Sequence, residues 1–375
     1  MSRLEKRIYT LRQQMEEASL DAFLVLSGEN RRYLSSFAAN DGQFNESAGA
    51  LFITQKKQFL LTDSRFASEA QQDAPLFETV TYPKGLSLLL PELCKNFSIH
   101  TLALETSRLT YTQFSQIRKE FENFSSPTRL LTIENLVEKQ RMYKDETEIN
   151  LLRKALHLSE ETFIKFLKTF HIELTEKEAA WQLEKLLREQ GLQLSFPIIA
   201  ATGPNSAHPH ATPGNRKFKK GDFALFDFGA RYQGYCADIT RTFSPSIATS
   251  EFIKAFEAVR VAQELAISKI RAGAHGQVVD QTARKYLEEN GFAGKFTHSL
   301  GHGVGLQVHE APRLSPIKND ILEEGMVITV EPGVYIEGLG GIRLEQMVVV
   351  RSDHGEILNS LSNQEVLDQM LNLSS

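Results

Sequence analysis

The sequence has few cysteines, no long apolar run and no excess of positive charge. Its two cysteines, Cys94 and Cys236, are too few to build a disulfide scaffold among 375 residues, which indicates a reducing compartment. Every apolar run falls well short of a membrane span, and the charged amino-terminal stretch lacks the apolar core of a signal peptide. A net charge of -5 gives no support for binding to nucleic acid or to an anionic membrane. We therefore expect a cytoplasmic protein whose partners are small molecules or proteins.

The composition is that of an ordinary globular protein, with 41% hydrophobic and 24% charged residues. Its length exceeds the size at which one hydrophobic core usually stops growing, so we expect two domains. Residues 1–135 alternate strand-like apolar runs with helical stretches, which predicts a small α/β domain. The predicted helices lie near residues 3–18, 66–73, 85–95 and 108–122, and the predicted strands are "AFLVL", "GALFIT", "QFLLTD" and "HTLALE".

Residues 136–375 have a different texture and predict an α+β domain. Capping boxes at Asp145 with Glu148 and at Thr175 with Glu178 each open a helix. Two further helices are expected near residues 251–271 and 277–290. The final third is rich in glycine and strand-like, with "MVITVEPGVYI" and "IRLEQMVVV" as the clearest strands, so we expect helices packed on a largely antiparallel sheet.

Two aspartates stand out in the stretch "LFDFGARYQGYCADITRTF", which reads as two strands joined by a turn. A turn centred between Tyr232 and Gln233 would place Asp227 and Asp238 directly opposite one another. Residues directly opposite on paired strands are about 5 Å apart, and like charges at that separation are destabilising unless a proton or a cation lies between them. Aspartates near turns are common, so this pair alone is weak evidence for a metal site.

More candidate ligands follow. In "HSLGHGVGLQVHEAP", His298, His302 and His309 fall within twelve residues, and the interleaved glycines favour extended or irregular backbone over a helix. For any single histidine, a satisfied surface position is the simpler explanation. Glu331 and Glu345 are isolated charges in otherwise apolar strands, and Arg343 could pair with one of them.

One arginine cannot balance four carboxylates. Four carboxylates and at least one histidine on strand-like backbone fit a site for two metal ions about 3.5 Å apart with a water or hydroxide between them. A set so rich in oxygen favours Mn²⁺ or Fe²⁺, with Co²⁺ and Zn²⁺ as alternatives.

The motifs "DFGARYQGYCADITRT", "HSLGHGVGLQVHE", "TVEPGVY" and "GIRLE" resemble, in order, those of the pita-bread metallopeptidases. That family includes methionine aminopeptidase, aminopeptidase P, prolidase and the metal-free creatinase. The resemblance covers the whole chain, because residues 1–135 are similar to the amino-terminal domain of the creatinase and proline-specific branches. It implies a pita-bread catalytic domain over residues 136–375. The metal ligands that it implies are Asp227, Asp238, His302, Glu331 and Glu345, with Asp238 and Glu345 shared by both ions.

The resemblance also implies roles for four further residues and for one of the ligands. A metal-bridging hydroxide would attack the carbonyl carbon before proline, and Glu331 would take the water's proton and deliver it to the leaving prolyl nitrogen. His309 and His210 would bind the oxyanion or orient the substrate, and His298 would be a further active-site histidine. Arg343 would support this cluster.

The implied activity is hydrolysis of the Xaa-Pro bond by an Xaa-Pro dipeptidase or an Xaa-Pro aminopeptidase, in a homodimer with Mn²⁺ as the first choice of metal. Arg313 is a candidate for binding the free carboxylate of a dipeptide, and a surface arginine is the equal alternative. The other class of function left open is a pita-bread protein without peptidase activity that binds a partner. Retention of all five ligand positions argues for the enzyme.

Overall fold

The computed structural model describes residues 1–39 and 47–371. The chain divides into two compact units, Met1–Arg141 and Met142–Ser375. The division lies six residues after the boundary expected between residues 135 and 136. Each unit is described by itself.

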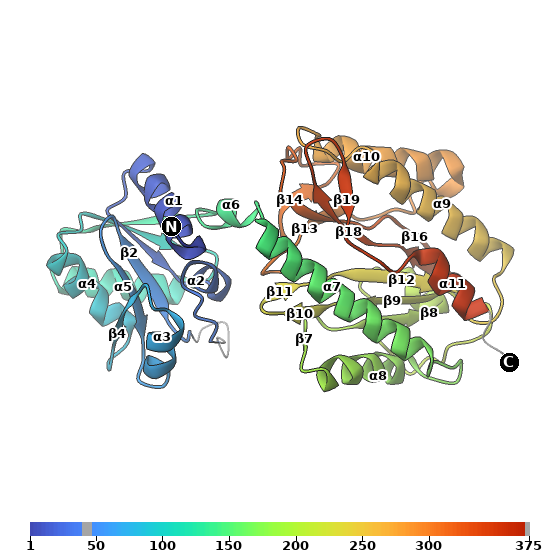
Figure 1. Ribbon diagram of the computed structural model, residues 1–375, viewed down its shortest axis with the longest axis horizontal. Coiled ribbons are helices and arrows are strands. Elements are labelled where there is room, and N and C mark those ends of the chain that lie inside the picture. The colour runs from blue at the N-terminus through green and yellow to red at the C-terminus, as the bar shows by residue number, and fades with distance from the viewer. Residues whose placement is uncertain (40–46, 372–375) are drawn as a thin grey trace. The chain divides into compact units, whose positions relative to one another are not determined.

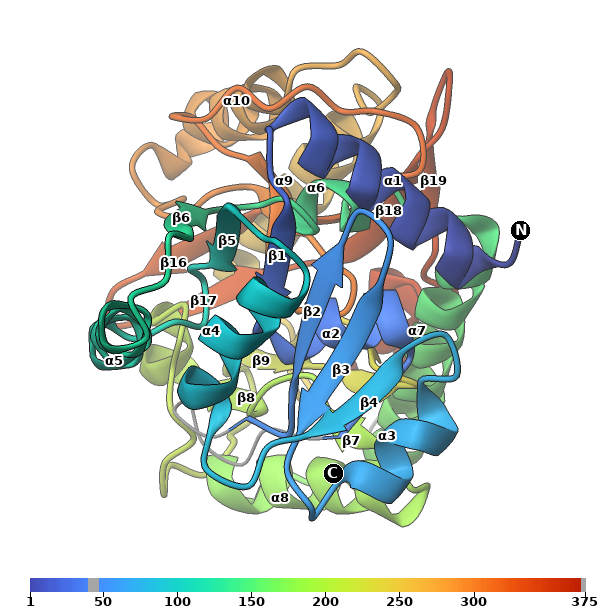
Figure 2. The same ribbon diagram turned by 90° about the vertical axis from the view of Figure 1, so that its left-hand side faces the viewer.

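The first unit is a six-stranded mixed sheet between helices, in the order β4-β3-β2-β1-β5-β6. The strands are β1 (Ala22–Val25), β2 (Ala50–Thr54), β3 (Gln58–Thr62), β4 (Glu78–Thr81), β5 (Thr101–Glu105) and β6 (Arg129–Ile133). The helices are α1 (Arg3–Glu17), α2 (Gly28–Ser35), α3 (Ala67–Asp73), α4 (Leu86–Asn96), α5 (Tyr111–Asn123) and α6 (Glu138–Arg141). Apolar side chains of α4 and α5 pack on one face of the sheet, and α2 lies behind the other face (Figures 1 and 2). The predicted α/β class is confirmed.

The second unit begins with the two helices that the capping boxes predict. Asp145 and Thr175 each accept a hydrogen bond from the backbone three residues on, and they open α7 (Glu146–Leu167) and α8 (Glu176–Glu189). A second helix pair, α9 (Ser250–Ile267) and α10 (Gly276–Leu287), follows, and α11 (Asn363–Leu371) ends the described chain. Helices α7 and α8 pack on the strands that precede α9, whereas α9 and α10 pack on the strands that follow (Figure 1).

Among the described residues of this unit, every strand pair is antiparallel, as predicted. The earlier strands form two small sheets, β11-β10-β7 and β12-β9-β8, and the later ones form a five-stranded sheet, β14-β13-β15-β18-β19, and a two-stranded ribbon, β16-β17. The earlier strands are β7 (Gln193–Leu194), β8 (Ile199–Thr202), β9 (Ala224–Phe228), β10 (Ala230–Tyr232), β11 (Tyr235–Cys236) and β12 (Ile239–Phe243). The later strands are β13 (Gly301–Gly303), β14 (Glu310–Leu314), β15 (Val327–Val330), β16 (Gly333–Ile336), β17 (Gly340–Arg343), β18 (Gln346–Val350) and β19 (Gly355–Ile357).

Two of the predicted strands are each divided in the structure. "MVITVEPGVYI" forms β15 in the five-stranded sheet and β16 in the ribbon, with Glu331 and Pro332 between them. "IRLEQMVVV" returns from the ribbon to the five-stranded sheet as β17 and β18, with Leu344 and Glu345 between them. The chain thus passes twice between the same two sheets, and each crossover carries one of the candidate glutamates.

An aromatic core supports the hairpin of β9 and β12. Phe226 of β9 stacks on Phe243 of β12 with ring centroids 5.7 Å apart, and Phe163 of α7 stacks on Phe228 at 4.6 Å. Because side chains alternate along a strand, Asp227 points to the opposite face from Phe226 and Phe228. The packed rings therefore give the aspartate a rigid platform.

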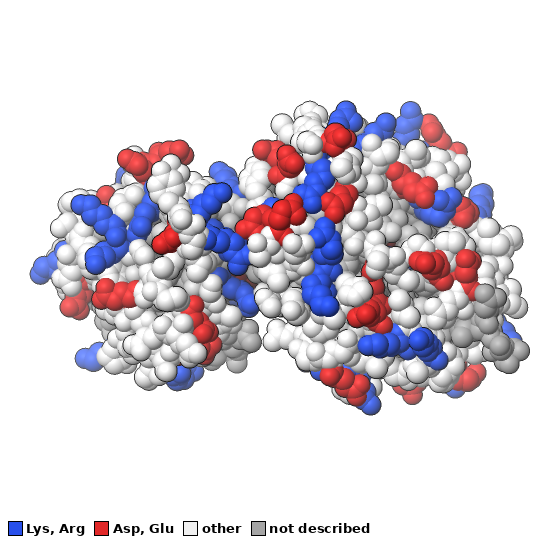
Figure 3. Space-filling view, in the orientation of Figure 1, with Lys and Arg blue, Asp and Glu red and all other residues white. Residues whose placement is uncertain are grey.

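On the face shown in Figure 3, basic and acidic side chains are interspersed over each unit. Among the described residues, no helix is long and apolar enough to cross a membrane.

Candidate active site

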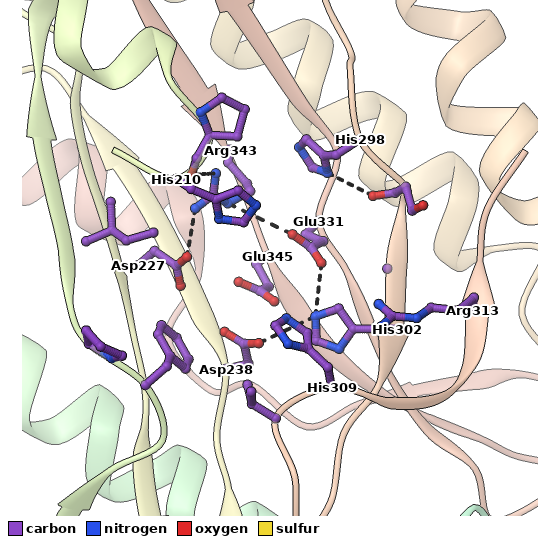
Figure 4. A pocket seen from close by; sticks show the side chains of 17 residues that line it. His210, Asp227, Asp238, His298, His302, His309, Arg313, Glu331, Arg343 and Glu345 are labelled. Atoms are coloured by element: carbon purple, nitrogen blue, oxygen red, sulfur yellow. Dashed lines mark hydrogen bonds and ion pairs between the residues drawn. The ribbon is translucent and has the colours of Figure 1, made fainter. Parts of the chain in front are cut away.

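A pocket of about 390 Å³ in the second unit brings the candidate residues together. All ten residues singled out in the sequence line it: His210, Asp227, Asp238, His298, His302, His309, Arg313, Glu331, Arg343 and Glu345 (Figure 4). Asp227 and Asp238 come from the β9–β12 hairpin, His302 from β13, Arg313 from β14, Arg343 from the end of β17 and the two glutamates from the crossovers, whereas His210, His298 and His309 lie in the loops before β9, β13 and β14.

The two aspartates share one face of the hairpin, but their predicted pairing is wrong by two residues. Asp227 lies opposite Thr240, not opposite Asp238. The turn is centred one residue later than expected, because Gln233 and Gly234 both adopt positive φ, at 46° and 87°, as a two-residue hairpin turn requires. A shift of two residues preserves the face of a strand, so both carboxylates still reach the pocket.

His302 reaches the pocket from the middle of the short strand β13. This strand passes very close to both of its neighbours: a Cβ on Gly301 would lie 2.0 Å from the Thr329 carbonyl oxygen, and one on Gly303 would lie 2.1 Å from that of Ala311. Only glycine fits at either position. The glycines thus permit the extended backbone that the sequence predicts, and His302 lies between them with its Nδ1 3.1 Å from the Gly303 carbonyl oxygen.

Three candidate ligands meet closely in the pocket. One side-chain ligand atom each from Asp238, His302 and Glu345 lies within 4.8 Å of the others, and all three residues are buried. His302 Nε2 is 3.3 Å from Glu331 Oε1 and 3.6 Å from Asp238 Oδ2 (Figure 4). Among the described residues, Asp227 Oδ1 and Glu345 Oε1 are buried acceptors without a hydrogen-bond partner. Buried oxygens without donors are costly unless a cation binds them, so the donor set fits divalent metal ions.

The carboxylates repel one another strongly. Burial raises the pKa of Asp238 well above its usual range, and the charges of Glu345, Asp227 and Glu331 raise it further. Burial also raises the pKa of Glu345 well above normal, together with the charges of Glu331 and Asp227. Burial raises the pKa of Asp227 as well, and the positive charge of Arg343 partly offsets this rise. Metal ions would remove this repulsion.

Glu331 behaves differently from its neighbours. Burial acts to raise its pKa, but the contact with His302 and the positive charges of His298 and Arg343 outweigh burial and lower the pKa to about 2. Glu331 is therefore an ionised carboxylate at physiological pH.

Arg343 connects the carboxylates to two uncharged side chains, Thr240 and Tyr335, that the sequence did not single out. Its Nη2 donates to Asp227 Oδ2 at 2.7 Å, its Nη1 donates to Tyr335 Oη at 2.8 Å, and its Nε donates to Thr240 Oγ1 at 3.0 Å. Thr240 Oγ1 in turn donates to Glu345 Oε2 at 2.8 Å. Thr240 and Tyr335 both lie inside the quoted motifs, where uncharged side chains gave no signal of their own.

The remaining histidines lie around the edge of this cluster. His298 Nε2 is 2.8 Å from Tyr335 Oη, which places it in the Arg343 network. The rings of His309 and His302 meet edge to face with centroids 4.4 Å apart. Partial burial and the neighbouring His302 lower the pKa of His309 to about 4, so its imidazole is neutral at pH 7. His210 reaches the pocket from an exposed loop, whereas His208 does not line it.

Arg313 and a group of apolar residues complete the lining. Arg313 lies on β14 directly opposite His302 of β13, and Figure 4 shows its side chain beside that histidine. The sequence gave no signal for the apolar lining, which comprises Phe196, Pro197, Ile199, Pro209 and Val308. The pocket thus combines a buried carboxylate cluster, neutral and cationic donors and an apolar wall.

Two family models match the chain, one over each unit. Residues 150–352 match the model described as "Metallopeptidase family M24", and residues 7–143 match "Creatinase/Prolidase N-terminal domain".

Curated and solved proteins resemble the chain over nearly its whole length. An uncharacterized peptidase of Bacillus subtilis, YqhT, is 33% identical over 92% of this chain and 95% of its own. The structure of an Xaa-Pro dipeptidase from Bacillus anthracis superposes with a TM-score of 0.89 and 33% identity, covering 96% of this chain and 98% of that one. An X-Pro aminopeptidase from Thermotoga maritima superposes with a TM-score of 0.85 and 34% identity, covering 94% and 98%.

Proposed function

We propose that this chain, which belongs to metallopeptidase family M24, hydrolyses the peptide bond that precedes a proline, in Xaa-Pro dipeptides or at the amino terminus of longer peptides. Family membership makes the chain a metallopeptidase. The observation that carries the proposal is the buried cluster of four carboxylates and His302, in which two acceptor oxygens have no partner among the described residues. The similarity to an Xaa-Pro dipeptidase and to an X-Pro aminopeptidase supports proline as the second residue of the substrate.

We infer that two divalent ions, Mn²⁺ for preference, bind this cluster. The residues that would hold them are Asp227, Asp238, His302, Glu331 and Glu345. Oxygen-rich donors with one imidazole suit Mn²⁺, with Fe²⁺, Co²⁺ and Zn²⁺ as alternatives. When bound, such ions lower the pKa of water and polarise a carbonyl group.

The side chains around the cluster would move protons and stabilise charge. Glu331, which is ionised, would take a proton from the attacking water and pass it to the prolyl nitrogen, which must be protonated to leave. His309, neutral at pH 7, would donate a hydrogen bond to the developing oxyanion, and His210 would orient the substrate. Arg343 and His298 would hold the carboxylates in place through Asp227 and Tyr335.

Substrate length is a separate question, because one solved relative is named a dipeptidase and another an aminopeptidase at nearly equal identity. Arg313 lines the pocket beside His302, where it could bind the free carboxylate of a substrate that ends at proline. A longer peptide has no carboxylate at that position.

The test uses an Xaa-Pro dipeptide and a longer Xaa-Pro peptide with the Mn²⁺-loaded protein, followed by Asp238→Asn and Glu345→Gln. We expect turnover of at least one substrate by the wild type and its loss in both variants. The matched control is Asp353→Asn, because the Asp353 side chain is 84% exposed and does not line the pocket. Undiminished turnover in the two site variants would refute the metal mechanism. Absence of turnover by the wild type would favour a binding role instead.

The homodimer and the cytoplasmic location inferred from the sequence and its resemblance stay predictions. Light scattering would measure the first, and cell fractionation would locate the chain.

A further inference from the structure

The two crossovers that carry Glu331 and Glu345 lie between the five-stranded sheet and the ribbon, outside both. Three backbone hydrogen bonds hold them: Glu331 N donates to the Leu300 carbonyl oxygen at 2.8 Å, Glu345 N to that of Thr240 at 3.2 Å, and Leu344 N to that of Pro332 at 3.3 Å. Glu331 follows the last residue of β15, and Glu345 precedes the first residue of β18. Strands β15 and β18 pair within the five-stranded sheet, whereas β16 and β17 pair within the ribbon. The separation of the two glutamates therefore depends on these backbone hydrogen bonds and on the side chains that contact the chain beside each glutamate.

One side chain contacts the chain immediately before both glutamates. Gln263 of α9 donates from its amide nitrogen to the carbonyl oxygen of Val330 at 2.8 Å and to that of Leu344 at 2.7 Å. A glutamine amide carries two hydrogens, so each carbonyl can receive one. Each carbonyl belongs to the residue that immediately precedes a candidate glutamate.

The amide of Gln263 is itself held in place. The side chain is only 3% exposed, and its Oε1 accepts a hydrogen bond from Asn363 Nδ2 at 3.2 Å. This contact orients the amide so that its nitrogen faces the two carbonyls. Rotation of the amide would place its oxygen against two acceptors, which is unfavourable in a buried site.

We propose that Gln263 is a positioning residue that sets the distance between Glu331 and Glu345 and thereby the ability of the site to hold two metal ions. The proposal rests on the proposed function, because it takes these two glutamates as ligands. Gln263 does not line the pocket and contacts neither carboxylate, so it acts only through the backbone. The outer partners of metal ligands commonly contribute about 10–100-fold to metal affinity.

A purely structural role makes a different prediction. If Gln263 only ties α9 to the sheets, its loss would lower the melting temperature of the metal-free and the Mn²⁺-loaded protein equally and would leave Mn²⁺ affinity unchanged. The test therefore measures Mn²⁺ binding directly.

The central variant is Gln263→Met, which keeps the approximate length and volume of the side chain and removes both donors. The matched control is Gln190→Met at the end of α8. The Gln190 amide also donates twice, to Thr162 Oγ1 at 2.6 Å and to the Leu186 carbonyl oxygen at 3.1 Å, but it does not line the pocket. Each protein is stripped with a chelator, checked for folding by circular dichroism and titrated with Mn²⁺ by calorimetry.

We expect two Mn²⁺ ions to bind to the wild type and to Gln190→Met. In Gln263→Met, the dissociation constant of at least one ion should rise by about 10–100-fold, and the Mn²⁺-induced rise in melting temperature should shrink. With an Xaa-Pro substrate at saturating Mn²⁺, kcat should fall more than KM changes.

A folded Gln263→Met that binds two ions with wild-type affinity would overturn the positioning role while leaving the proposed function intact. A wild type that binds no Mn²⁺ would overturn both. If Gln263→Met does not fold, Asn363→Ala replaces it, because this change keeps the two donors but removes the contact that orients them. We then expect a smaller loss of Mn²⁺ affinity, and an unchanged affinity would refute the role.

Discussion

Replacing Asp238 by asparagine should stabilise the metal-free protein while abolishing its stabilisation by metal. Ligand atoms of Asp238 and Glu345 lie within 4.8 Å of each other. Two full charges at that distance repel by about 3 kcal/mol at an effective dielectric constant near 20. Protonation of the pair relieves part of this repulsion, so we expect a gain of about 1–3 kcal/mol in the free energy of unfolding.

The assay is thermal unfolding with a chelator and with Mn²⁺. For a domain of this size each kcal/mol corresponds to about 2–4 °C, so metal-free Asp238→Asn should melt several degrees above the metal-free wild type. Mn²⁺ at 100 times its dissociation constant should add about 2.7 kcal/mol to the wild type and little to the variant. Asp353→Asn should match the wild type in both conditions.

If the metal-free Asp238→Asn variant melts at a lower temperature than the metal-free wild type, repulsion between the carboxylates does not destabilise the metal-free protein. An undiminished Mn²⁺-induced rise in the variant would refute the assignment of Asp238 as a ligand.

Three further predictions concern pH, the His210 loop and substrate length. The folded-state pKa values of Asp238 and Glu345 lie above their unfolded values, so the stability of the metal-free protein should fall as pH rises from about 4 through the folded values. Thermal unfolding at pH 6 to 8 should show a shallower fall of melting temperature with pH for Asp238→Asn than for the wild type. An equal fall would contradict the raised pKa of Asp238. Glu176 accepts hydrogen bonds from the backbone nitrogens of Thr202 and Gly214 at 2.8 and 2.7 Å and so joins the two ends of the loop that carries His210. Glu176→Gln should lower kcat/KM roughly tenfold and leave the Mn²⁺ affinity measured by calorimetry unchanged. A loss of both kcat/KM and Mn²⁺ affinity would contradict a role confined to the His210 loop. Arg313→Ala should raise KM for a dipeptide by about 10–100-fold and leave KM for a longer Xaa-Pro peptide nearly unchanged; equal effects on both would exclude a role in binding the substrate carboxylate.

Local sequence signals predicted most of the regular structure. The capping boxes located the starts of α7 and α8, and apolar runs located the central strands of the first unit. Helix α2 and the edge strands β4 and β6 were not predicted. Strand β4 is exposed or half-buried along its whole length and therefore carries no apolar run. Its position depends on pairing with β3, which no local pattern encodes.

The chemistry of the site was easier to predict than its geometry. All ten candidate side chains line one pocket, and eight of them lie in the four motifs that resemble the family; His210 and Arg313 lie outside these motifs. The register of the hairpin was wrong because the turn depends on Gln233 adopting positive φ, which is uncommon outside glycine, asparagine and aspartate. The sequence did not predict the roles of Gln263 and Glu176, because each side chain contacts backbone groups at least 26 residues away along the chain.

The distribution of the candidate ligands over the second unit has a consequence for its assembly. Asp227 and Asp238 lie in the hairpin that precedes α9, and His302, Glu331 and Glu345 lie in β13 and the two crossovers that follow it. The chain between these two parts runs through residues 244–249, where Ile247 is 57% exposed. Each part carries an incomplete coordination set, so neither could hold both ions alone. Metal binding would thus link the two parts by ligand bonds to the same ions, in addition to the packing between them.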